Sequence, residues 1–173
     1  MAEPNTEYTP QVSSKPTLAD LLTIENKASI FYAYARELEL SQGLSQKEMK
    51  MTLFVPTNKA VMNLARKPHQ GSKLADENIS ISEQEYDQIS KANVERWVSA
   101  HIVPGAPIPL TGSQQTLLTS KSITFKPIAK AKNPDWTQVT LEDGIHIISK
   151  KEASNGDLYM IDGAIVSDAS TLD

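Results

Sequence analysis

The sequence predicts an α+β fold in which helices come first and an antiparallel β-sheet follows. Up to residue 105, apolar residues recur at helical spacing behind polar caps, whereas the later segment alternates short β-prone runs with turn pairs. Because helices and strands occupy separate halves of the chain, an antiparallel sheet is favoured over alternating βαβ units. A length of 173 residues with 39% hydrophobic residues suffices for one domain with its own core.

The chain is expected to hold a single domain between two short ends. Residues 1–16 are polar and contain three prolines, which is typical of a flexible lead-in. The periodic pattern then covers 17–167, and 168–173 form a C-terminal tail. We find no internal repeat and no low-complexity segment that would divide the central region.

Two helices are predicted before the first strand. A short helix is expected to begin after Thr17, because Thr17 and Asp20 have the spacing of a capping box. A longer helix is expected over 27–40, where apolar residues recur at every fourth position from Ile30 onward. Gly43 follows that segment and predicts its end.

A strand, a corner and a helix are predicted around residue 56. Residues 51–55 form a short apolar, β-prone run, and Pro56 ends it because proline lacks the N–H that a strand ladder needs. The hydroxyl of Thr57 is expected to cap a helix over 58–66. Asn58 is expected to support the start of the same helix.

Further helices lead into the predicted strands. Ser82 and Glu85 have capping-box spacing, which predicts a helix there, and a second helix is expected over 91–100. A turn is predicted at 101–105, and Asn-Gly and Asp-Gly pairs after residue 140 favour tight hairpins. Strands are expected at 116–119, 122–128, 136–141, 145–149, 157–161 and 164–167.

Four segments of the chain together resemble a known family. The stretches TLFVPTNKAV over 52–61, WVSAHIVPG over 97–105 and NGDLYMIDGAI over 155–165 resemble, in order and spacing, the signature segments of fasciclin-like domains. Residues 17–40 are similar to the helical opening of that family. The residues that carry the resemblance are Thr52, Phe54, Pro56, Thr57, Asn58, Ala60, His101, Asn155, Gly156, Ile161, Asp162 and Gly163.

The resemblance implies a compact wedge-shaped β-sandwich of mostly antiparallel strands, flanked by helices from the N-terminal half. It also implies a non-catalytic binding or adhesion module of the cell surface, wall or extracellular matrix, secreted or in the vacuolar lumen, with a protein or glycan partner. Neither enzyme activity nor a cofactor is implied. The alternative within the same fold is a soluble intracellular or vacuolar protein with a small-ligand or housekeeping role.

Three places in the chain depart from the family pattern. Ala100 stands where some animal members have the tyrosine of a Tyr-His pair that binds cells, and Tyr159 replaces the usual histidine. Lys150 and Lys151 stand where some members present an Asp-Ile pair proposed to engage integrins. Because the metal site of an integrin needs an acidic ligand, integrin binding is not expected for this chain.

His101 is the main single candidate for chemistry, and two hypotheses remain open for it. The residue could act in binding, or in hydrolysis with a nearby carboxylate. It could instead be a buried histidine that bonds to the backbone and fixes the junction after the helix, which is the favoured hypothesis. Asp157 and Asp162 could also form a carboxylate pair for general acid–base catalysis. The favoured hypothesis is that Asp162 orders its own Asp-Gly turn.

Other classes of catalytic and metal site lack their motifs. The chain has no cysteine, which excludes disulfides and thiolate sites, and it has no nucleophile or phosphate-binding motif. His69 and His146 have no ligand partner at a useful spacing, so no metal site is expected.

Charge and hydropathy limit the possible partners. A formal net charge of -4 gives no basic surface of the kind that nucleic acid needs. No run of the sequence approaches the about 20 apolar residues of a membrane span. The N-terminus has no signal-peptide pattern, so a leader is expected to be absent from this chain.

Two surface features are candidates for modification or binding. Asn78 begins an Asn-Ile-Ser sequon and is a candidate glycosylation site. A candidate interaction patch for acidic glycans or phosphates consists of Lys121, Lys126, Lys130, Lys132 and Trp136. The alternative for the patch is a solvated strand edge, on which lysines prevent strand-to-strand aggregation.

Overall fold

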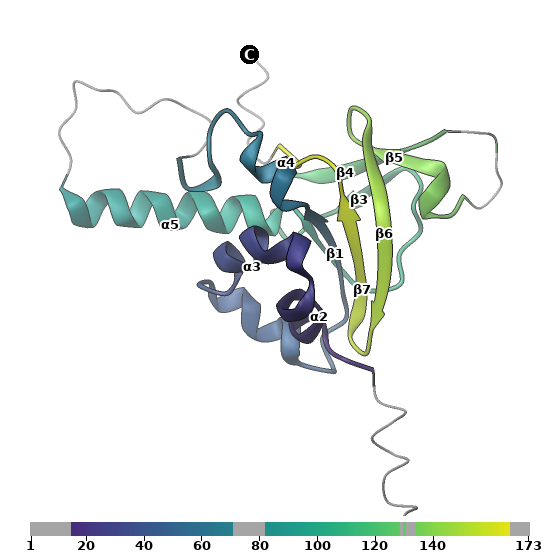
Figure 1. Ribbon diagram of the computed structural model, residues 1–173, viewed down its shortest axis with the longest axis horizontal. Helices are drawn as coiled ribbons and strands as arrows, with labels where there is room; N and C mark the ends of the chain where they lie inside the picture. Colours follow the sequence, from purple (N-terminus) through teal and green to yellow (C-terminus); the bar gives the residue numbers. More distant parts are fainter. Residues whose placement is uncertain (1–14, 71–81, 129, 131–133, 167–173) are drawn as a thin grey trace, which may run out of the picture.

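The fold is a curled sheet with helices packed against one of its faces (Figure 1). The computed structural model describes residues 15–70, 82–128, 130 and 134–166. The helices are α2 (Leu18–Ile24), α3 (Ser29–Ala35), α4 (Asn58–Met62) and α5 (Glu83–Ser99). The strands are β1 (Met51–Pro56), β2 (Ile102–Pro104), β3 (Ser113–Gln115), β4 (Ser122–Pro127), β5 (Val139–Leu141), β6 (Ile145–Ala153) and β7 (Gly156–Ile161). Short 3₁₀ helices lie at Asn26–Ala28, Glu39–Ser45, Pro68–Gln70 and Trp136–Gln138.

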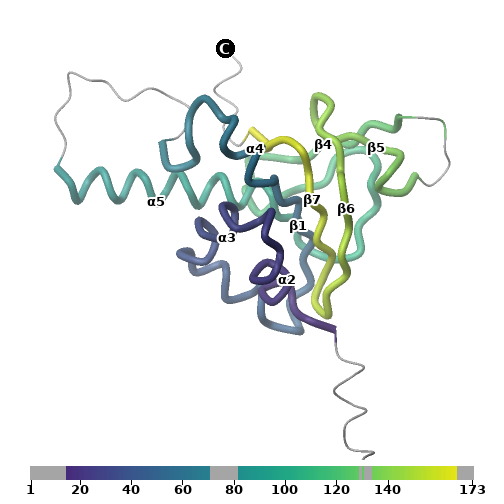
Figure 2. Tube along the Cα trace, viewed as in Figure 1, coloured from purple at the N-terminus to yellow at the C-terminus, as the bar shows by residue number. Residues whose placement is uncertain are grey.

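Seven strands form one sheet in the order β2-β1-β7-β6-β5-β4-β3. β1 and β7 run parallel and side by side (Figure 2), whereas the other neighbouring strands are antiparallel. The sheet curls until its two edge strands, β2 and β3, come close together. A hydrogen bond joins them there, in which the N–H of Leu117, just after β3, donates to the carbonyl of Ile102 in β2 at 2.9 Å. The predicted α+β class is therefore confirmed. The predicted wedge-shaped sandwich is not confirmed, since the strands form one nearly closed sheet.

Two buried clusters lie on opposite faces of β1 and β7. Along β7, Leu158 and Met160 belong to the cluster under the helices, whereas Tyr159 and Ile161 belong to the inner cluster inside the curl. This alternation is the two-residue period of a strand. Phe54 of β1 joins the inner cluster. Because both faces of these strands are covered, their sequences are predominantly apolar rather than alternating.

The predicted helix caps are present. Thr17 and Asp20 form a capping box at the start of α2, and Ser82 and Glu85 form another at the start of α5. Each box satisfies backbone N–H groups that the first turn of a helix leaves unpaired. No helix within the described ranges is both long and apolar enough to cross a membrane.

The helical half differs from the prediction in several places. The helix predicted over 27–40 is broken, because α3 ends at Ala35 and Leu38 takes an extended backbone with φ -101° and ψ 151°. Leu38 buries its side chain in this conformation, so packing decides where the helix stops. Gly43 lies inside the following 3₁₀ helix rather than beyond the helix end. α4 ends at Met62, earlier than predicted, and α5 is one continuous helix where two were predicted.

The strand half also needs several corrections. Residues 102–104, predicted as part of a turn, form β2 and pair with β1. The strand predicted at 116–119 does not form, because the hydroxyl of Thr116 donates to the carbonyl of Lys121 at 2.7 Å and closes a local turn. The strand predicted at 164–167 is absent through residue 166, and residue 167 lies outside the described part. The remaining predictions correspond to β4, β5, β6 and β7, except that residues 136–138 form a 3₁₀ helix instead of the start of a strand. The strand β3 was not predicted.

Candidate functional site

His101 lies in the core where α5 ends and β2 begins. Its side chain has no exposure to solvent, and its Nδ1 lies 2.7 Å from the carbonyl oxygen of Trp97. Its Nε2 accepts a hydrogen bond from the backbone N–H of Ile165 at 2.9 Å. Because Nε2 accepts, the ring proton sits on Nδ1 and donates to Trp97. Burial lowers the pKa of His101 to about 4, although the bond to Trp97 opposes this shift.

Both ring nitrogens of His101 are used in structural bonds. The ring also packs against Phe31 and Trp97, with centroids 5.9 and 4.7 Å away. Among the residues described, no carboxylate bonds to the ring, so the hydrolase hypothesis lacks its second catalytic group. The geometry agrees with the favoured hypothesis of a buried histidine that fixes this junction.

Asn155 fastens the β6–β7 turn to the helical part of the molecule. Its Oδ1 accepts a hydrogen bond from the backbone N–H of Leu18 at 2.8 Å. Its Nδ2 donates to the carbonyls of Leu44 and Gln46 at 2.9 and 3.1 Å. The side chain is fully buried, so these bonds satisfy groups that would otherwise be costly to bury.

Close approach of backbone to backbone explains Gly156. Its φ of 153° is rare for residues with a side chain, and a Cβ there would lie 1.8 Å from the carbonyl oxygen of Met51. Gly163 is less tight, since a Cβ there would lie 3.0 Å from a side-chain carbon of Ile145. Both glycines are therefore explained by the lack of room for a side chain, and not by a chemical role.

The corner after β1 links three helices. The Thr57 hydroxyl accepts a hydrogen bond from the N–H of Ala60 at 3.2 Å, so the predicted cap is present. The prediction for Asn58 is wrong, because its side chain does not bond within its own helix. Its Oδ1 accepts from the N–H of Ile30 at 2.8 Å and its Nδ2 donates to the carbonyl of Asn26 at 3.0 Å. Asn58 therefore joins α4 to α3 and to the turn before it.

The signature residues within the strands build the core. The hydroxyl of Thr52 donates to a backbone carbonyl at 2.8 Å. Phe54 stacks on Tyr159 with ring centroids 5.1 Å apart and planes 8° from parallel. Pro56 pairs with Ile161 at the end of the parallel ladder.

Asp162 ties β6 to the end of β7. Its Oδ1 accepts a hydrogen bond from the N–H of His146 at 2.8 Å, and its Oδ2 lies 3.3 Å from Nδ1 of the same histidine. The predicted role for Asp162, ordering its own Asp-Gly turn, is therefore wrong, since the bonds cross to another strand. Asp157 lies at the other end of β7, about 16 Å away at the rise of a strand. The two carboxylates do not form a catalytic pair.

The members of the candidate lysine patch differ in their surroundings, and binding by the patch stays a prediction. Lys121 forms an ion pair with Glu142, and both side chains are largely buried. The charge of Lys121 is therefore already used within the fold. Among the other members, Lys126 and Lys130 are exposed, Trp136 packs against the inner cluster, and Lys132 lies outside the described residues.

Two further sequence predictions concern glycosylation and metal binding. Asn78 lies outside the described residues, so its glycosylation stays a prediction. In the part of the chain that the structure describes, no group of three histidine, aspartate or glutamate residues could hold a metal ion. His69 instead stacks on Tyr34, with ring centroids 6.4 Å apart.

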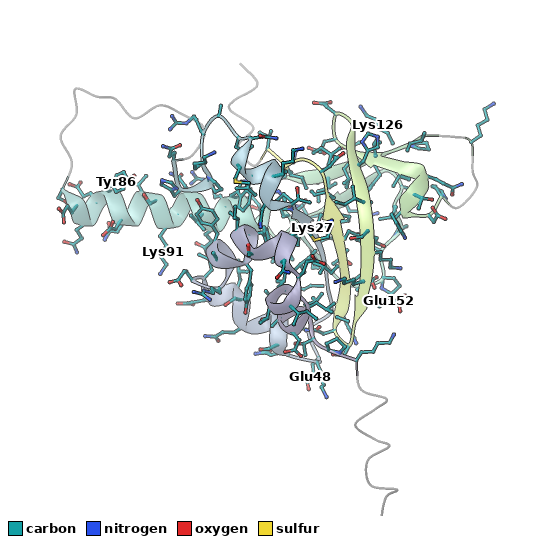
Figure 3. The ribbon with its side chains drawn as sticks, in the orientation of Figure 1. Lys27, Glu48, Tyr86, Lys91, Lys126 and Glu152 are labelled. Carbon is teal, nitrogen blue, oxygen red and sulfur yellow. The ribbon has the colours of Figure 1, made fainter. Side chains whose placement is uncertain are left out.

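A cleft of about 400 Å³ opens beside the β6–β7 turn. Its lining comes from the segment before α2, the residue before β1, the 106–107 loop and the ends of β6 and β7. Figure 3 shows Glu152 toward this end of β6 and Lys126 toward the other end of the sheet. The polar side chains of the lining are Lys15, Lys50, Lys150, Glu152, Ser154 and Asp157.

Charged side chains of both signs face one another in the cleft. Glu152 lies between two lysines, 3.1 Å from Nζ of Lys15 and 3.8 Å from Nζ of Lys150. The ammonium of Lys150 also lies 5.8 Å from the centre of the Tyr159 ring, so the cleft adjoins one end of the inner cluster. Hydrogen bonds from Lys15 lower the pKa of Glu152, which keeps this carboxylate charged.

The sequence predictions do not include this cleft. They treat Asp157 only as a possible partner for Asp162, and they leave Lys50 out. A usable signal is present, because Asp157 is a charged residue in the otherwise apolar strand Gly156–Ile161. The cleft itself depends on bringing together residues from 15 to 157, which no local pattern predicts.

Comparison with known proteins agrees with this architecture. The fasciclin domain family model matches residues 26–167. A FAS1 domain-containing protein of Emericella nidulans is 26% identical over 160 residues, covering 88% of this chain and 63% of the relative. Similar proteins of Aspergillus fumigatus (30% identical, 55% of this chain and 42% of the relative) and Eremothecium gossypii (28%, 86% and 64%) also match. The chain thus spans less than two thirds of the length of these relatives.

A solved structure shares the fold. The FAS1 domain pair from the insect cell adhesion molecule fasciclin I superposes with a TM-score of 0.61 at 11% sequence identity. The match covers 92% of this chain and 53% of that chain, and at this identity it concerns the fold alone. The family model covers most of the chain and the signature segments lie where the fold requires them. The chain therefore belongs to the fasciclin domain family.

Proposed function

We propose that this protein is a non-catalytic binding module that attaches to a cell surface, cell wall or extracellular matrix through a protein or glycan partner. Fasciclin domains are generally adhesion-type modules, typically extracellular or at the cell surface. The insect protein that shares the fold is described as a cell adhesion molecule. The proposal extends this general role to the present chain.

The observation that supports the proposal most is that the signature residues hold the fold together. His101, Asn58 and Asn155 direct their side-chain polar atoms chiefly to backbone groups of other segments. A side chain whose donors and acceptors are used inside the protein has none left for a substrate. We therefore expect function to lie on the surface that the signature residues support.

Binding to intact cells and to isolated wall and matrix material tests the proposal. The folded, labelled protein is expected to bind saturably, and chemically unfolded protein serves as the control. A salt series separates the contribution of charged contacts to binding from that of uncharged contacts, because binding through exposed charges weakens as the Debye length shortens. Absence of fold-dependent binding to every preparation would contradict the proposal.

One observation favours a second function, namely the cleft beside the β6–β7 turn. A cleft of about 400 Å³ with a few convergent polar groups has the size of a small-ligand site. In this alternative the chain is a soluble intracellular or vacuolar protein that binds a small ligand without an adhesive partner. A ligand that raises the melting temperature of a protein without affinity for any wall or matrix would favour it.

A further inference from the structure

We propose that the cleft beside the β6–β7 turn binds an acidic saccharide, whose carboxylate is held by Lys50 and whose ring hydroxyls donate to Asp157. The inference rests on the proposed function and deepens it, since it names the surface and the ligand class of the same binding role. Three features of the cleft carry it. Among the described residues, they are a lysine without an acidic partner, a carboxylate of the lining that receives no hydrogen bond and a buried hydroxyl without a bond.

Lys50 supplies a positive charge that no carboxylate in the described part of the chain neutralises. Its Nζ donates to the carbonyl of Ser154 at 2.8 Å, which fixes the ammonium at the cleft. An ammonium has three N–H donors, so two remain for a ligand. Because the lining holds three lysines against two carboxylates, the cleft as a whole is suited to an anionic group.

Asp157 presents its carboxylate to the cleft and receives no hydrogen bond from any described residue. It is 8% exposed and lies on β7 directly across from Glu152 of β6. Like charges in such a pair weaken an antiparallel ladder. Burial raises the pKa of Asp157, Lys150 opposes this shift, and Glu152 adds to it. A residue that weakens its own strand in this way is a functional-site candidate.

The hydroxyl of Ser154 is the third unsatisfied group. Its oxygen is buried and has no hydrogen-bond partner in the part of the chain that the structure describes. Buried polar groups in folded proteins are normally paired, so an unpaired one needs an explanation. Ser154 lines the cleft, and rotation of its side chain toward the cleft would let a ligand hydroxyl supply the missing bond.

Together these groups require a ligand with one anionic group and several hydroxyl donors beside it. An acidic saccharide carries both on one ring, and two neighbouring hydroxyls match the two acceptor oxygens of a carboxylate. The rim of the cleft is open, because the side chains of Lys15 and Glu152 are each 59% exposed. A saccharide chain can therefore enter and leave the cleft without being enclosed.

Isothermal titration calorimetry of the full chain with trigalacturonate near neutral pH tests the inference. The wild type is expected to bind, and Lys50→Met and Asp157→Asn are each expected to weaken binding by about tenfold or more, since each loses a charge-assisted bond. Lys91→Met is the matched control and is expected to keep the affinity, because this exposed lysine lies on α5, away from Glu152 and the cleft (Figure 3). The methyl ester of trigalacturonate keeps the hydroxyls but loses the charge, so it is expected not to bind.

The melting temperature separates loss of ligand binding from loss of fold. Asp157→Asn removes a buried charge, so this variant is expected to melt higher than the wild type while it loses trigalacturonate. Unchanged affinity in both cleft variants, or equal weakening by Lys91→Met, overturns the inference. Binding of free glutamate instead of trigalacturonate, with the same dependence on Lys50 and Asp157, also overturns the saccharide assignment.

The same variants distinguish failure of the inference from failure of the proposed function. Equal binding of wild type and Lys50→Met to wall or matrix material overturns the cleft assignment while the proposed function stands. Binding of trigalacturonate by a wild type that attaches to no preparation overturns the adhesive function and supports the cleft assignment.

Discussion

The Nε2 of His101 accepts a hydrogen bond from the backbone N–H of Ile165, a residue 64 positions later in the chain. The bond joins the end of α5 to the segment after β7. It requires a neutral imidazole, because a protonated Nε2 would place its own hydrogen against the N–H of Ile165. The signature histidine of this chain is therefore a link between two distant segments, and its protonation state is part of the fold.

Acid is expected to destabilise the protein through His101. Its pKa is about 4 in the folded state against 6.5 for the free group, so the unfolded chain binds more protons between these values. The free energy of unfolding should fall as pH drops from about 6.5 to 4, by about 3 kcal/mol in total. Urea unfolding across this pH range measures the slope.

Two histidine variants identify the source of that slope. His101→Gln removes the titrating group and is expected to flatten the slope, whatever stability it loses at neutral pH. His146→Gln is the comparison variant, because it removes an exposed histidine and keeps both hydrogen bonds of His101. An undiminished slope in His101→Gln would contradict the assignment.

Gly156→Ala is expected to lower the free energy of unfolding by more than about 3 kcal/mol, or to prevent folding. The added Cβ would lie 1.8 Å from the carbonyl oxygen of Met51 and would force β1 and β7 apart. Gly144→Ala is the matched control, since Gly144 also has a positive φ of 106° but a Cβ added there would have no neighbouring atom within 4 Å. The control should lose only about 1–2 kcal/mol. Equal losses, measured by thermal denaturation, would show that backbone strain alone explains Gly156.

Phe54→Ala is expected to cost about 3–5 kcal/mol, because it removes a fully buried ring from the inner cluster. The ring contacts Tyr159 and Phe125, with centroids 5.1 and 5.6 Å away. Ile128→Ala, at a residue that is 58% exposed, should cost less than about 0.5 kcal/mol. Urea unfolding compares the two variants, and near wild-type stability of Phe54→Ala would be incompatible with a buried β1.

Asp162→Ala is expected to cost about 1 kcal/mol, because the backbone N–H of His146 loses its acceptor. The contribution is small, since the pair is exposed to solvent. Hydrogen exchange at the amide of His146 should become faster than in the wild type. An unchanged exchange rate would mean that Asp162 does not hold the start of β6.

Some features could be predicted from the sequence because they depend on near neighbours. The capping boxes at Thr17 and Ser82 each need only a residue three positions away. The roles of Asn58 and Asp162 could not be predicted in this way. Their partners lie 28 and 16 residues distant, so the bonds exist only after the chain has folded.

Long-range packing determines other features of the fold that local propensity does not predict. Leu38 leaves the helix because the core accepts its side chain, although the apolar spacing continues past α3. The parallel pairing of β1 with β7 joins strands about 100 residues apart, whereas the turn pairs predict only antiparallel neighbours. The cleft follows from that pairing, since it places Lys50 beside Ser154 and Asp157.

The most direct test measures two quantities for each of two variants: the melting temperature, and binding to wall or matrix material. Asn58→Ala removes the bonds between α4 and α3, so it is expected to melt lower and still bind wherever it remains folded. Asp157→Asn is expected to melt higher and to lose binding. This opposite pattern would separate the residues that hold the fold from those that meet the ligand. Full binding by Asp157→Asn, or loss of binding by folded Asn58→Ala, would contradict that separation.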